Sequence, residues 1–386
     1  MKTTKNPRFR HITDAVLKDL EKKIVIISGP RQCGKTTLAK NLTNSFQYFN
    51  YDISEDRSIF LKKTWNRDVD LVIFDELHKM PKWKSWLKGI YDSDEENPNI
   101  LVTGSAKLDT FKKVGESLAG RHFYFRLHPF DIKELSQTKI NLSPDTIMDR
   151  LMNVSGYPEP FLTNDMREYK RWRQSHIDLI LRQDLIDIQV IRDIRTMELL
   201  IELLRSKVGS PLSINSLAND LQKDHKTIQR WLDLLEEVYI IFKISPYSKD
   251  IARSVKKEPK YYFYDTAYVN GDESIKLENL VACSLLKESH YQQDVHGKSY
   301  TLNFLKVKRG REIDFLLKSN DIENKSIMIE VKLSDDEPAP NFKLFGDQVK
   351  NVEMIQLVKN LKRDKSNAYG VKIKKASEWL AEIKLD

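Results

Sequence analysis

Short apolar runs alternate with amphipathic segments over residues 1–140 of the chain. Runs at 24–28, 47–51, 71–75, 99–103 and 123–127 have the length and composition of buried strands. The segments 36–42 and 83–91, which lie between these runs, have the spacing of helices. This alternation predicts an α/β domain with a mostly parallel, five-stranded sheet.

The pattern changes from residue 129 onward. Long helical stretches at 170–190 and 195–208 precede a compact helix–turn–helix pattern at 213–238. A region of mixed helix and strand then runs from 278 to 386. We therefore predict three parts, residues 1–140, 141–255 and 256–386, because a chain of this length exceeds one ordinary core.

The helix–turn–helix pattern permits two interpretations. Its second helix has an apolar and a polar face, carrying Ile228, Leu232 and Leu235 on the first and Lys226, Gln229, Arg230 and Asp233 on the second. With the strand 238–244 as a wing, this helix would enter the major groove of DNA. The acids at 220, 224, 233, 236 and 237 offset the basic residues, which favours a packing or protein-contact role.

The amino-acid composition limits the classes of partner that this chain is expected to bind. The 386 residues include 64 Lys and Arg against 56 Asp and Glu, a formal charge of +8 that suits an anionic partner such as DNA or a solvated basic surface. The two cysteines make neither a disulfide framework nor a zinc-ligand set. No apolar run is long enough to span a bilayer, and the start lacks a secretory signal. We expect a cytoplasmic protein with no membrane partner.

A phosphate-binding loop follows the first expected strand. The run GPRQCGKT at 29–36 matches the pattern G-x-x-x-x-G-K-[ST] in full, between a strand and a helix. Glycines let the backbone N–H groups of such a loop point at phosphates. We expect Lys35 to reach the β- and γ-phosphates of ATP and Thr36 to ligate Mg²⁺. The expected nucleotide contacts here are Gly29, Pro30, Arg31, Gln32, Cys33, Gly34, Lys35, Thr36 and Thr37.

A second motif supplies the carboxylates that this chemistry requires. The run DLVIFDE at 70–76 is an apolar strand that ends in Asp75 and Glu76. Ligands gather at the carboxyl ends of the strands in open α/β sheets. Asp75 is therefore expected to hold Mg²⁺, and Glu76 to act on the attacking water as a base.

Thr103 and Arg121 are two further candidates. Thr103 ends another expected strand and is a candidate sensor of the γ-phosphate. Arg121 follows a predicted helix and would, as an arginine finger, stabilise the charge of the transferred phosphoryl group. The alternative is that Arg121 is an ordinary surface arginine.

The C-terminal region places acids and a lysine on two expected strands. Asp314 lies at the start of one strand, and Glu330 and Lys332 share a face of the next. Glu278, on an expected helix, could complete the cluster. Asp314 and Glu330 would ligate a metal ion, and Lys332 would activate water or offset developing charge. The alternative is an alternating strand with solvated acids.

These motifs together resemble those of one family of prokaryotic AAA+-like P-loop ATPases, whose members carry a restriction-endonuclease-like C-terminal domain of unassigned function. The resemblance rests on the runs SGPRQCGKTT, FDE, TGS, LAGR and HPF in the first part, and on GYPEP, RQDL, KYYFYDT, LEN, REIDF and IEVK in the rest. It implies a five-stranded AAA+-type core, a helical and winged-helix middle, a nuclease-like α/β end domain and an arginine-finger role for Arg121.

We therefore predict an ATP-binding and ATP-hydrolysing protein that uses Mg²⁺, forms a homo-oligomer and acts on DNA. In this hypothesis the C-terminal cluster is a metal-dependent endonuclease site. The alternative is an ATP-driven switch whose nuclease-like domain binds a protein partner and cuts nothing. The sequence leaves the choice between them open.

Overall fold

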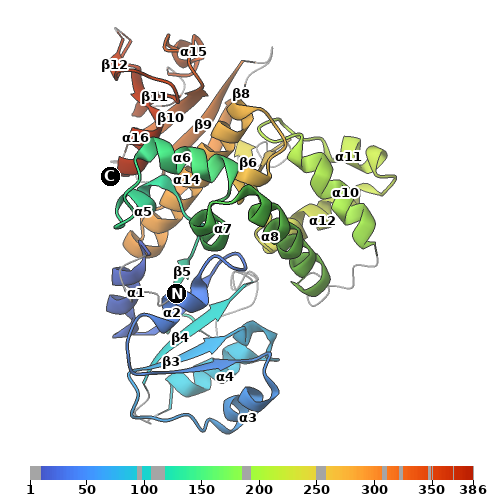
Figure 1. The fold of residues 1–386 in the computed structure, drawn as a ribbon, viewed down its shortest axis with the longest axis vertical. Coiled ribbons are helices and arrows are strands. Elements are labelled where there is room, and N and C mark those ends of the chain that lie inside the picture. The colour runs from blue at the N-terminus through green and yellow to red at the C-terminus, as the bar shows by residue number, and fades with distance from the viewer. Residues whose placement is uncertain are drawn as a thin grey trace. The chain divides into compact units, whose positions relative to one another are not determined.

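The computed structural model describes residues 10–93, 98–105, 118–184, 193–248, 258–306, 311–320, 325–346, 349, 351–367 and 369–385. The chain forms two compact units, residues 1–128 and residues 129–386. Figure 1 shows their elements. The three-part division expected from the sequence stays a prediction.

The first unit is an α/β domain around one parallel sheet. Its strands are β1 (Ile24–Ser28), β2 (Phe46–Asn50), β3 (Leu71–Asp75), β4 (Asn99–Gly104) and β5 (His122–Arg126), in the order β2-β3-β4-β1-β5. Its helices are α1 (Thr13–Leu20), α2 (Lys35–Lys40), α3 (Ser54–Lys62), the short η1 (Leu77–Lys79) and α4 (Trp83–Tyr91). The predicted parallel sheet is confirmed, with β2 and β5 each beginning one residue earlier than expected.

The register of the sheet brings the carboxyl ends of its strands to one edge. Asp75 pairs with Thr103, and Ser28 pairs with Gly104. The central strands β1 and β3 are buried throughout, because neighbouring strands and covering helices enclose a continuous apolar run. Side chains that end these strands, and the loops that follow them, are therefore held close together.

Aromatic rings fill the core of this unit. The ring of Phe74 on β3 lies 5.1 Å from that of Phe60 on α3, and 5.3 Å from those of Trp65 and Trp86. Rings of this size bury large apolar areas, and their edge-to-face contacts add to that stabilisation. The strand that ends in Asp75 is thus anchored one residue before the candidate site.

The second unit begins with helices. They are α5 (Ile132–Ser136), α6 (Pro144–Asn153), α7 (Pro158–Thr163), α8 (Met166–Leu179), the π-helical turn η3 (Ile180–Asp184), α10 (Ile194–Arg205), α11 (Ile214–Asp220) and α12 (His225–Glu237). The expected helix at 170–190 begins earlier, at Met166, and its last residues lie outside the described part of the chain. Asp165 and Asp193 accept hydrogen bonds from backbone N–H groups in the first turns of α8 and α10, which fixes where these helices begin.

A mixed sheet with a long helix follows in the same unit. Its strands are β6 (Ile241–Pro246), β7 (Lys260–Phe263), β8 (Tyr300–Lys306), β9 (Glu312–Ser319), β10 (Ser326–Lys332), β11 (Val352–Val358), β12 (Lys365–Ser366) and β13 (Lys372–Lys375), in the order β12-β13-β11-β10-β9-β8-β6-β7. The remaining elements are η4 (Thr266–Tyr268), α14 (Glu273–His296), α15 (Asn341–Gly346) and α16 (Ala376–Glu382). Helix α14 packs against β7, β8, β9 and β10.

The helix–turn–helix pattern forms two helices, α11 and α12. Ile228, Leu232 and Leu235 are fully buried, whereas Lys226, Arg230 and Asp233 are exposed, as the pattern predicts. The strand expected at 238–244 begins at Ile241 instead, because a residue at positive φ, Tyr239, separates it from α12. It is also no isolated wing, since β6 pairs with β7 on one side and β8 on the other.

A buried ion cluster anchors α14. Lys287 on α14 donates to the Pro129 carbonyl at 3.1 Å and pairs with Asp131 at 2.9 Å and Glu134 at 2.6 Å. Buried charges are tolerated when they are paired and hydrogen-bonded in this way. The cluster fixes α5 against the helix that also carries Glu278.

Candidate functional site

The phosphate-binding loop connects β1 to α2, and its backbone requires glycine at two positions. Gly34 has a φ of 98°, which an L side chain rarely adopts. At Gly29 a Cβ atom would collide with the carbonyl oxygen of Leu127. The loop therefore depends on these glycines both for its turn and for its close approach to the end of β5.

The side chain of Arg10 stabilises this loop through hydrogen bonds to backbone carbonyls. Its guanidinium donates to the carbonyl of Cys33 at 2.6 Å and to that of His128 at 2.5 Å. Arg10 and Cys33 are both buried. No local pattern indicates this role for Arg10, because the arginine lies outside the motif and meets it only in the fold.

Lys35 is held within the loop. Its ammonium donates to the carbonyls of Gly29 at 2.8 Å and Pro30 at 2.7 Å, and the side chain is buried. No carboxylate pairs with Lys35 among the salt bridges of the described residues. Its charge thus remains available to an anionic ligand of the loop.

The carboxylate of Asp75 is surrounded by hydroxyl groups. Thr36 and Tyr48 donate to its Oδ2 at 2.9 and 2.7 Å, and Thr103 donates to its Oδ1 at 2.5 Å. The backbone N–H of Glu76 donates to Oδ1 at 3.1 Å. The structure thus brings together Thr36, Asp75 and Thr103, which the sequence placed in three separate motifs.

A carboxylate beside a threonine hydroxyl fits a magnesium ion. Mg²⁺ prefers hard oxygen ligands and is held in proteins by one or two carboxylates besides water and phosphate. Asp75 is buried, and Thr36 lies next to it at the start of α2. These two residues match the donor set that the sequence assigned to the metal.

Glu76, the residue after Asp75, has a backbone conformation that non-glycine residues rarely adopt. Its φ is 54°, in the left-handed region, which non-glycine residues adopt mainly at turns and functional sites. Burial, with a smaller contribution from Asp75, raises the pKa of Glu76 above its usual range, whereas Lys35 opposes the shift. Its Oε2 accepts from Ser105 at 3.3 Å and lies 3.5 Å from His78 Nε2.

His78 was not among the residues predicted from the sequence. Burial lowers its pKa to about 4, with the charges of Lys79 and Lys35 adding to the shift. The imidazole is therefore neutral near pH 7 and does not neutralise Glu76. Its signal in the sequence is weak, since a lone histidine two residues after a motif is common.

Arg121 lies at the other end of the sheet from the loop. Its carbonyl accepts from Ile24 N, at the start of β1, whereas the loop follows the end of that strand. Its guanidinium pairs with Asp92 through both carboxylate oxygens, at 2.6 and 3.1 Å. The helix expected before it falls outside the described residues. Five strand residues span about 16 Å, so Arg121 cannot serve the loop of its own chain.

The predicted C-terminal residues come from three elements of the second unit. Glu278 lies on α14, Asp314 on β9, and Glu330 and Lys332 on β10. The carboxylate of Asp314 accepts from the backbone N–H of Val331 at 2.8 Å, which joins β9 to β10 beyond their last paired residues. Glu330 Oε1 accepts from Lys332 Nζ at 2.7 Å.

Two residues missed by the sequence analysis hold Glu278. Tyr262 donates to its Oε1 at 2.7 Å, and Lys260 Nζ lies 3.2 Å from the same oxygen. Lys260 also pairs with Glu312 and is only 1% exposed. Both residues lie on β7, in the run KYYF, where period two would have placed them on one face.

Burial, together with neighbouring charges, raises the pKa of Asp314 and of Glu330. Burial, followed by the charges of Glu278 and Glu330, raises the pKa of Asp314 well above its usual range, against the opposing charge of Lys260. Burial also raises the pKa of Glu330, and the hydrogen bond from Lys332 opposes it. The cluster therefore favours a proton or a cation.

The metal site expected at Asp314 and Glu330, with Glu278 completing the cluster, stays a prediction. Within the described part of the chain, no three His, Cys, Asp or Glu side chains are arranged to hold a metal ion. Glu278 instead contacts Lys260 and Tyr262. One observation supports a smaller site: Glu330 is 5% exposed, and its Oε2 has no hydrogen-bond partner among the described residues.

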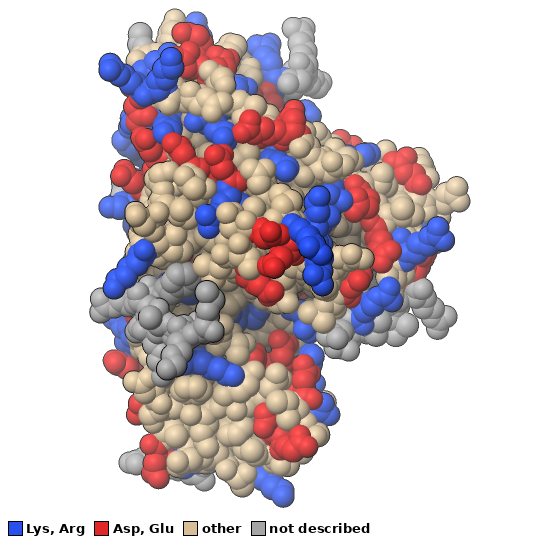
Figure 2. All heavy atoms as spheres, in the orientation of Figure 1, with Lys and Arg blue, Asp and Glu red and all other residues tan. Residues whose placement is uncertain are grey.

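On the face that Figure 2 shows, the charge of the described residues does not single out a nucleic-acid surface. Figure 2 shows basic and acidic side chains interspersed on the visible face. Lys243 of β6, the strand after the helix–turn–helix element, pairs with Glu236 of α12 at 3.2 Å and lies 3.9 Å from Asp233. The charge of Lys243 is therefore partly neutralised within the unit.

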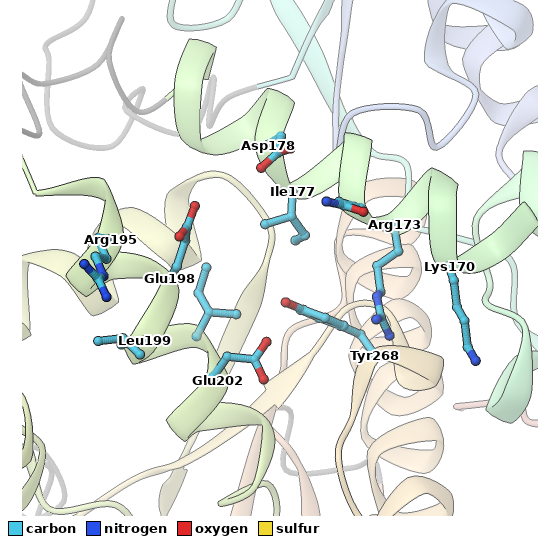
Figure 3. Close-up of a pocket in the computed structure, with 11 residues that line it drawn as sticks. Lys170, Arg173, Ile177, Asp178, Arg195, Glu198, Leu199, Glu202 and Tyr268 are labelled. Atoms are coloured by element: carbon cyan, nitrogen blue, oxygen red, sulfur yellow. The ribbon is translucent and has the colours of Figure 1, made fainter. Parts of the chain in front are cut away.

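A cavity of about 620 Å³ lies between α8 and α10, and no predicted site residue is among the residues that line it. Figure 3 shows Tyr268 between the two helices, with Arg173 from α8 and Glu202 from α10 beside it. The guanidinium carbons of Arg173 and Arg205 lie 5.1 and 4.3 Å from the centre of the Tyr268 ring.

None of the described helices has the length and apolar character needed to cross a membrane.

Three family models match successive parts of the chain. Residues 21–136 match an AAA domain, and residues 145–274 and 275–375 match two families described only as domains of unknown function, DUF8612 and DUF4143. No activity is attached to the part that holds Glu278, Asp314 and Glu330. The expected restriction-endonuclease-like domain thus stays a prediction.

Curated relatives agree over long stretches at low identity. An uncharacterized protein of Mycobacterium tuberculosis is 26% identical over 263 residues, covering 66% of this chain and 58% of the relative. An uncharacterized protein of Methanocaldococcus jannaschii is 25% identical over 346 residues, covering 78% of this chain and 76% of the relative. The chain thus spans less than two thirds of the first of these relatives.

Solved structures add little. A signal transduction ATPase with numerous domains and a tetratricopeptide repeat sensor, from Pyrococcus horikoshii, aligns with 72% of this chain and 44% of its own at 14% identity, with a TM-score of 0.23. That score is too low to support a common fold over this length. Together, the match of residues 21–136 to an AAA domain, the parallel sheet and the loop geometry support an AAA-like P-loop ATPase domain in the first part of the chain.

Proposed function

We propose that the first unit binds ATP with Mg²⁺ at residues 29–37 and hydrolyses it with Asp75 and Glu76. The observation that carries this proposal is the Asp75 carboxylate, which accepts from Thr36 at 2.9 Å and from Thr103 at 2.5 Å. Three segments meet there at the carboxyl edge of the sheet, where ligands bind in open α/β folds.

Each residue has a separate role in this proposal. Lys35 supplies the positive charge for the β- and γ-phosphates, and the loop amides bind the phosphate oxygens. Thr36 and Asp75 would hold the magnesium ion, which neutralises charge on the phosphates when it is bound. Thr103 orients Asp75, since its hydroxyl donates to Oδ1 from the neighbouring strand.

Glu76 is the residue proposed to orient and deprotonate the attacking water. Its raised pKa suits a base, because proton transfer is most efficient when the pKa of the base approaches the operating pH. Its side chain is 13% exposed, so water can reach it. The neutral His78 beside it leaves this basicity intact.

The test is phosphate release by purified protein with ATP, with and without Mg²⁺. Glu76→Gln keeps the shape and loses the base, so we expect turnover to fall by about 100-fold or more while nucleotide binding persists. Glu55→Gln, at an exposed position of α3, is the matched control and should leave turnover unchanged. Normal turnover in Glu76→Gln would remove Glu76 from the mechanism.

The position of Arg121 supports a finger that acts on a neighbouring subunit. Because Arg121 lies at the amino end of the sheet, it is too far to reach its own loop. In a homo-oligomer it would leave Asp92 and stabilise the charge of the phosphoryl group bound by the adjacent chain. Turnover per chain would then rise with protein concentration.

A second function, metal-dependent cleavage of a phosphodiester in DNA, is favoured by one observation in the second unit. Glu330 Oε2 is buried without a hydrogen-bond partner among the described residues, beside Asp314 and Lys332. A buried carboxylate oxygen without a donor is costly, and a cation would satisfy it. Asp314 and Glu330 would hold that cation, and Lys332 would offset charge on the phosphate.

The test is cleavage of plasmid and branched DNA with Mg²⁺ or Mn²⁺, with and without ATP. Asp314→Ala and Glu330→Ala should each abolish cleavage and leave ATP turnover intact, because the cluster and the loop lie in different units. Glu353→Ala, on the neighbouring strand β11, is the control. If the folded protein binds no Mn²⁺ at this cluster and cuts no DNA, an ATP-driven regulator that binds a protein partner is the better hypothesis.

A further inference from the structure

Asp75 already accepts as many hydrogen bonds as its carboxylate allows. A carboxylate oxygen offers two acceptor positions. At Oδ2 these are taken by the hydroxyls of Thr36 and Tyr48, and at Oδ1 by the hydroxyl of Thr103 and the N–H of Glu76. A carboxylate in this state has no acceptor position left for a metal ion or for a water in its shell. One donor must therefore withdraw before Asp75 can take part in a metal site.

Three of the four donors are poorly suited to withdraw. The N–H of Glu76 belongs to the backbone that follows Asp75, and it is fixed. Thr103 is fully buried on β4, directly beside Asp75 in the sheet. Thr36 can keep its hydrogen on Asp75 while its oxygen offers a lone pair to a cation, because a hydroxyl is both donor and acceptor.

Tyr48 is the donor that can leave. It lies on β2, the edge strand of the sheet, and its side chain is only partly buried. The side-chain amide nitrogen of Asn50 donates to its hydroxyl oxygen at 3.5 Å, a contact that the oxygen can keep when its hydrogen turns away from Asp75. The ammonium of Lys40 lies 3.5 Å from the centre of the Tyr48 ring and holds the ring in place while the hydroxyl hydrogen turns.

We propose that the Tyr48 hydroxyl is a displaceable cap on Asp75 that sets the metal affinity of the nucleotide site. In the structure it fills an acceptor position of Oδ2 at 2.7 Å. Metal entry requires this hydrogen bond to break, so the bond competes with the cation. Tyr48 is thus a positioning residue, since it acts through Asp75 and touches neither phosphate nor the reacting water. The inference rests on the proposed nucleotide site.

The experiment compares wild-type protein with Tyr48→Phe, which removes the hydroxyl and keeps the ring. Binding of a fluorescent ATP analogue is titrated with Mg²⁺, so the measurement does not depend on turnover. A hydrogen bond of this kind contributes about 0.5–1.5 kcal/mol net, so Tyr48→Phe should lower the Mg²⁺ concentration for half-maximal binding by about 2- to 10-fold. Nucleotide affinity without metal should stay within about twofold of wild type.

Tyr51→Phe is the matched control. Tyr51 follows the same strand and packs its ring on Phe60, and its hydroxyl makes no hydrogen bond among the described residues. It should leave the Mg²⁺ requirement unchanged, and thermal unfolding of both variants checks that each is folded. An unchanged or higher Mg²⁺ requirement in folded Tyr48→Phe would overturn the cap. If wild-type binding itself does not depend on Mg²⁺, the proposed metal role of Asp75 fails together with the cap.

Discussion

Asp75 ends β3 in the first unit, and Asp314 lies near the start of β9 in the second, but the two carboxylates are held by different kinds of neighbour. Asp75 accepts four hydrogen bonds from three neutral hydroxyls and one backbone amide. Asp314 accepts one from Val331 N and lies among the charges of Glu278, Glu330 and Lys260. One centre is satisfied by neutral dipoles and the other by opposing charges.

The difference indicates how each centre affects the stability of the folded chain. Neutral donors stabilise a buried carboxylate without needing a buried cation, so the nucleotide site adds ligand charge to a framework that is already satisfied. In the C-terminal cluster, Lys260 and Lys332 offset part of the charge of four carboxylates. Removing one of these lysines leaves carboxylates that repel one another without a neutralising charge. We therefore expect substitutions in the first unit to affect ligand binding and turnover, and those in the cluster to affect stability as well.

The largest effect is expected outside both centres, at Arg121. A trans-acting finger contributes about a thousandfold or more to turnover, so Arg121→Ala should lower ATP hydrolysis by that factor and spare nucleotide binding. Asp92→Ala is the control, because it breaks the same ion pair but removes no finger. Mixing Arg121→Ala with Lys35→Ala chains should restore activity. If mixing restores nothing and turnover per chain is flat with concentration, Arg121 is a surface arginine.

The next effect separates the two centres by stability. Lys260→Met leaves Glu278 and Glu312 without their buried cation, so we expect the free energy of unfolding to fall by about 3–5 kcal/mol. Lys306→Met is the control, since Lys306 is 40% exposed and lies 3.8 Å from Glu312; we expect a loss of at most about 1 kcal/mol. Denaturant unfolding measures both. Equal stability of the two variants would contradict the role given to Lys260.

Lys35 provides the corresponding test in the first unit. Lys35→Ala removes the charge proposed for the phosphates, so ATP affinity should fall by about 100-fold. Stability should change little, because Lys35 bonds only to two carbonyls and leaves no carboxylate unpaired. Lys62→Ala, at an exposed position of α3, is the control for binding. Calorimetry with ATP measures the affinity, and thermal unfolding measures the stability. A large loss of stability in Lys35→Ala would contradict the expected difference between the nucleotide site and the C-terminal cluster.

The smallest effect concerns Asp265, a buried carboxylate that belongs to neither centre. Tyr169 donates to its Oδ2 at 2.9 Å, but burial outweighs its hydrogen bonds and raises its pKa to about 6. A folded pKa above the unfolded value of 3.8 means that its stabilising contribution is complete below about pH 4 and is lost as the pH rises through 6. Relative to Asp265→Asn, wild type should lose about 2–3 kcal/mol between these limits. Parallel stability curves for the two proteins would show that the pKa of Asp265 is not raised.

The nucleotide loop and the sheet that presents it follow from the amino-acid sequence. The loop pattern needs only neighbouring residues, and the alternation of apolar runs with helices predicts a parallel sheet whose carboxyl ends meet. Thr36, Asp75 and Thr103 are therefore expected near one another on the strength of their motifs. The structure places them within hydrogen-bonding distance.

The neighbours that give these residues their properties follow only from the folded chain. Tyr48 and Asp75 are 27 residues apart in the sequence, and Arg10 and His128 are 118 residues apart. No local sequence pattern therefore predicts either contact. In the second unit, Lys260 and Tyr262 contact Glu278, which the sequence indicated only as a residue that could complete the C-terminal cluster. This is so because a motif records which groups are present, whereas hydrogen-bond saturation and charge pairing depend on strands and helices that become neighbours only when the chain folds.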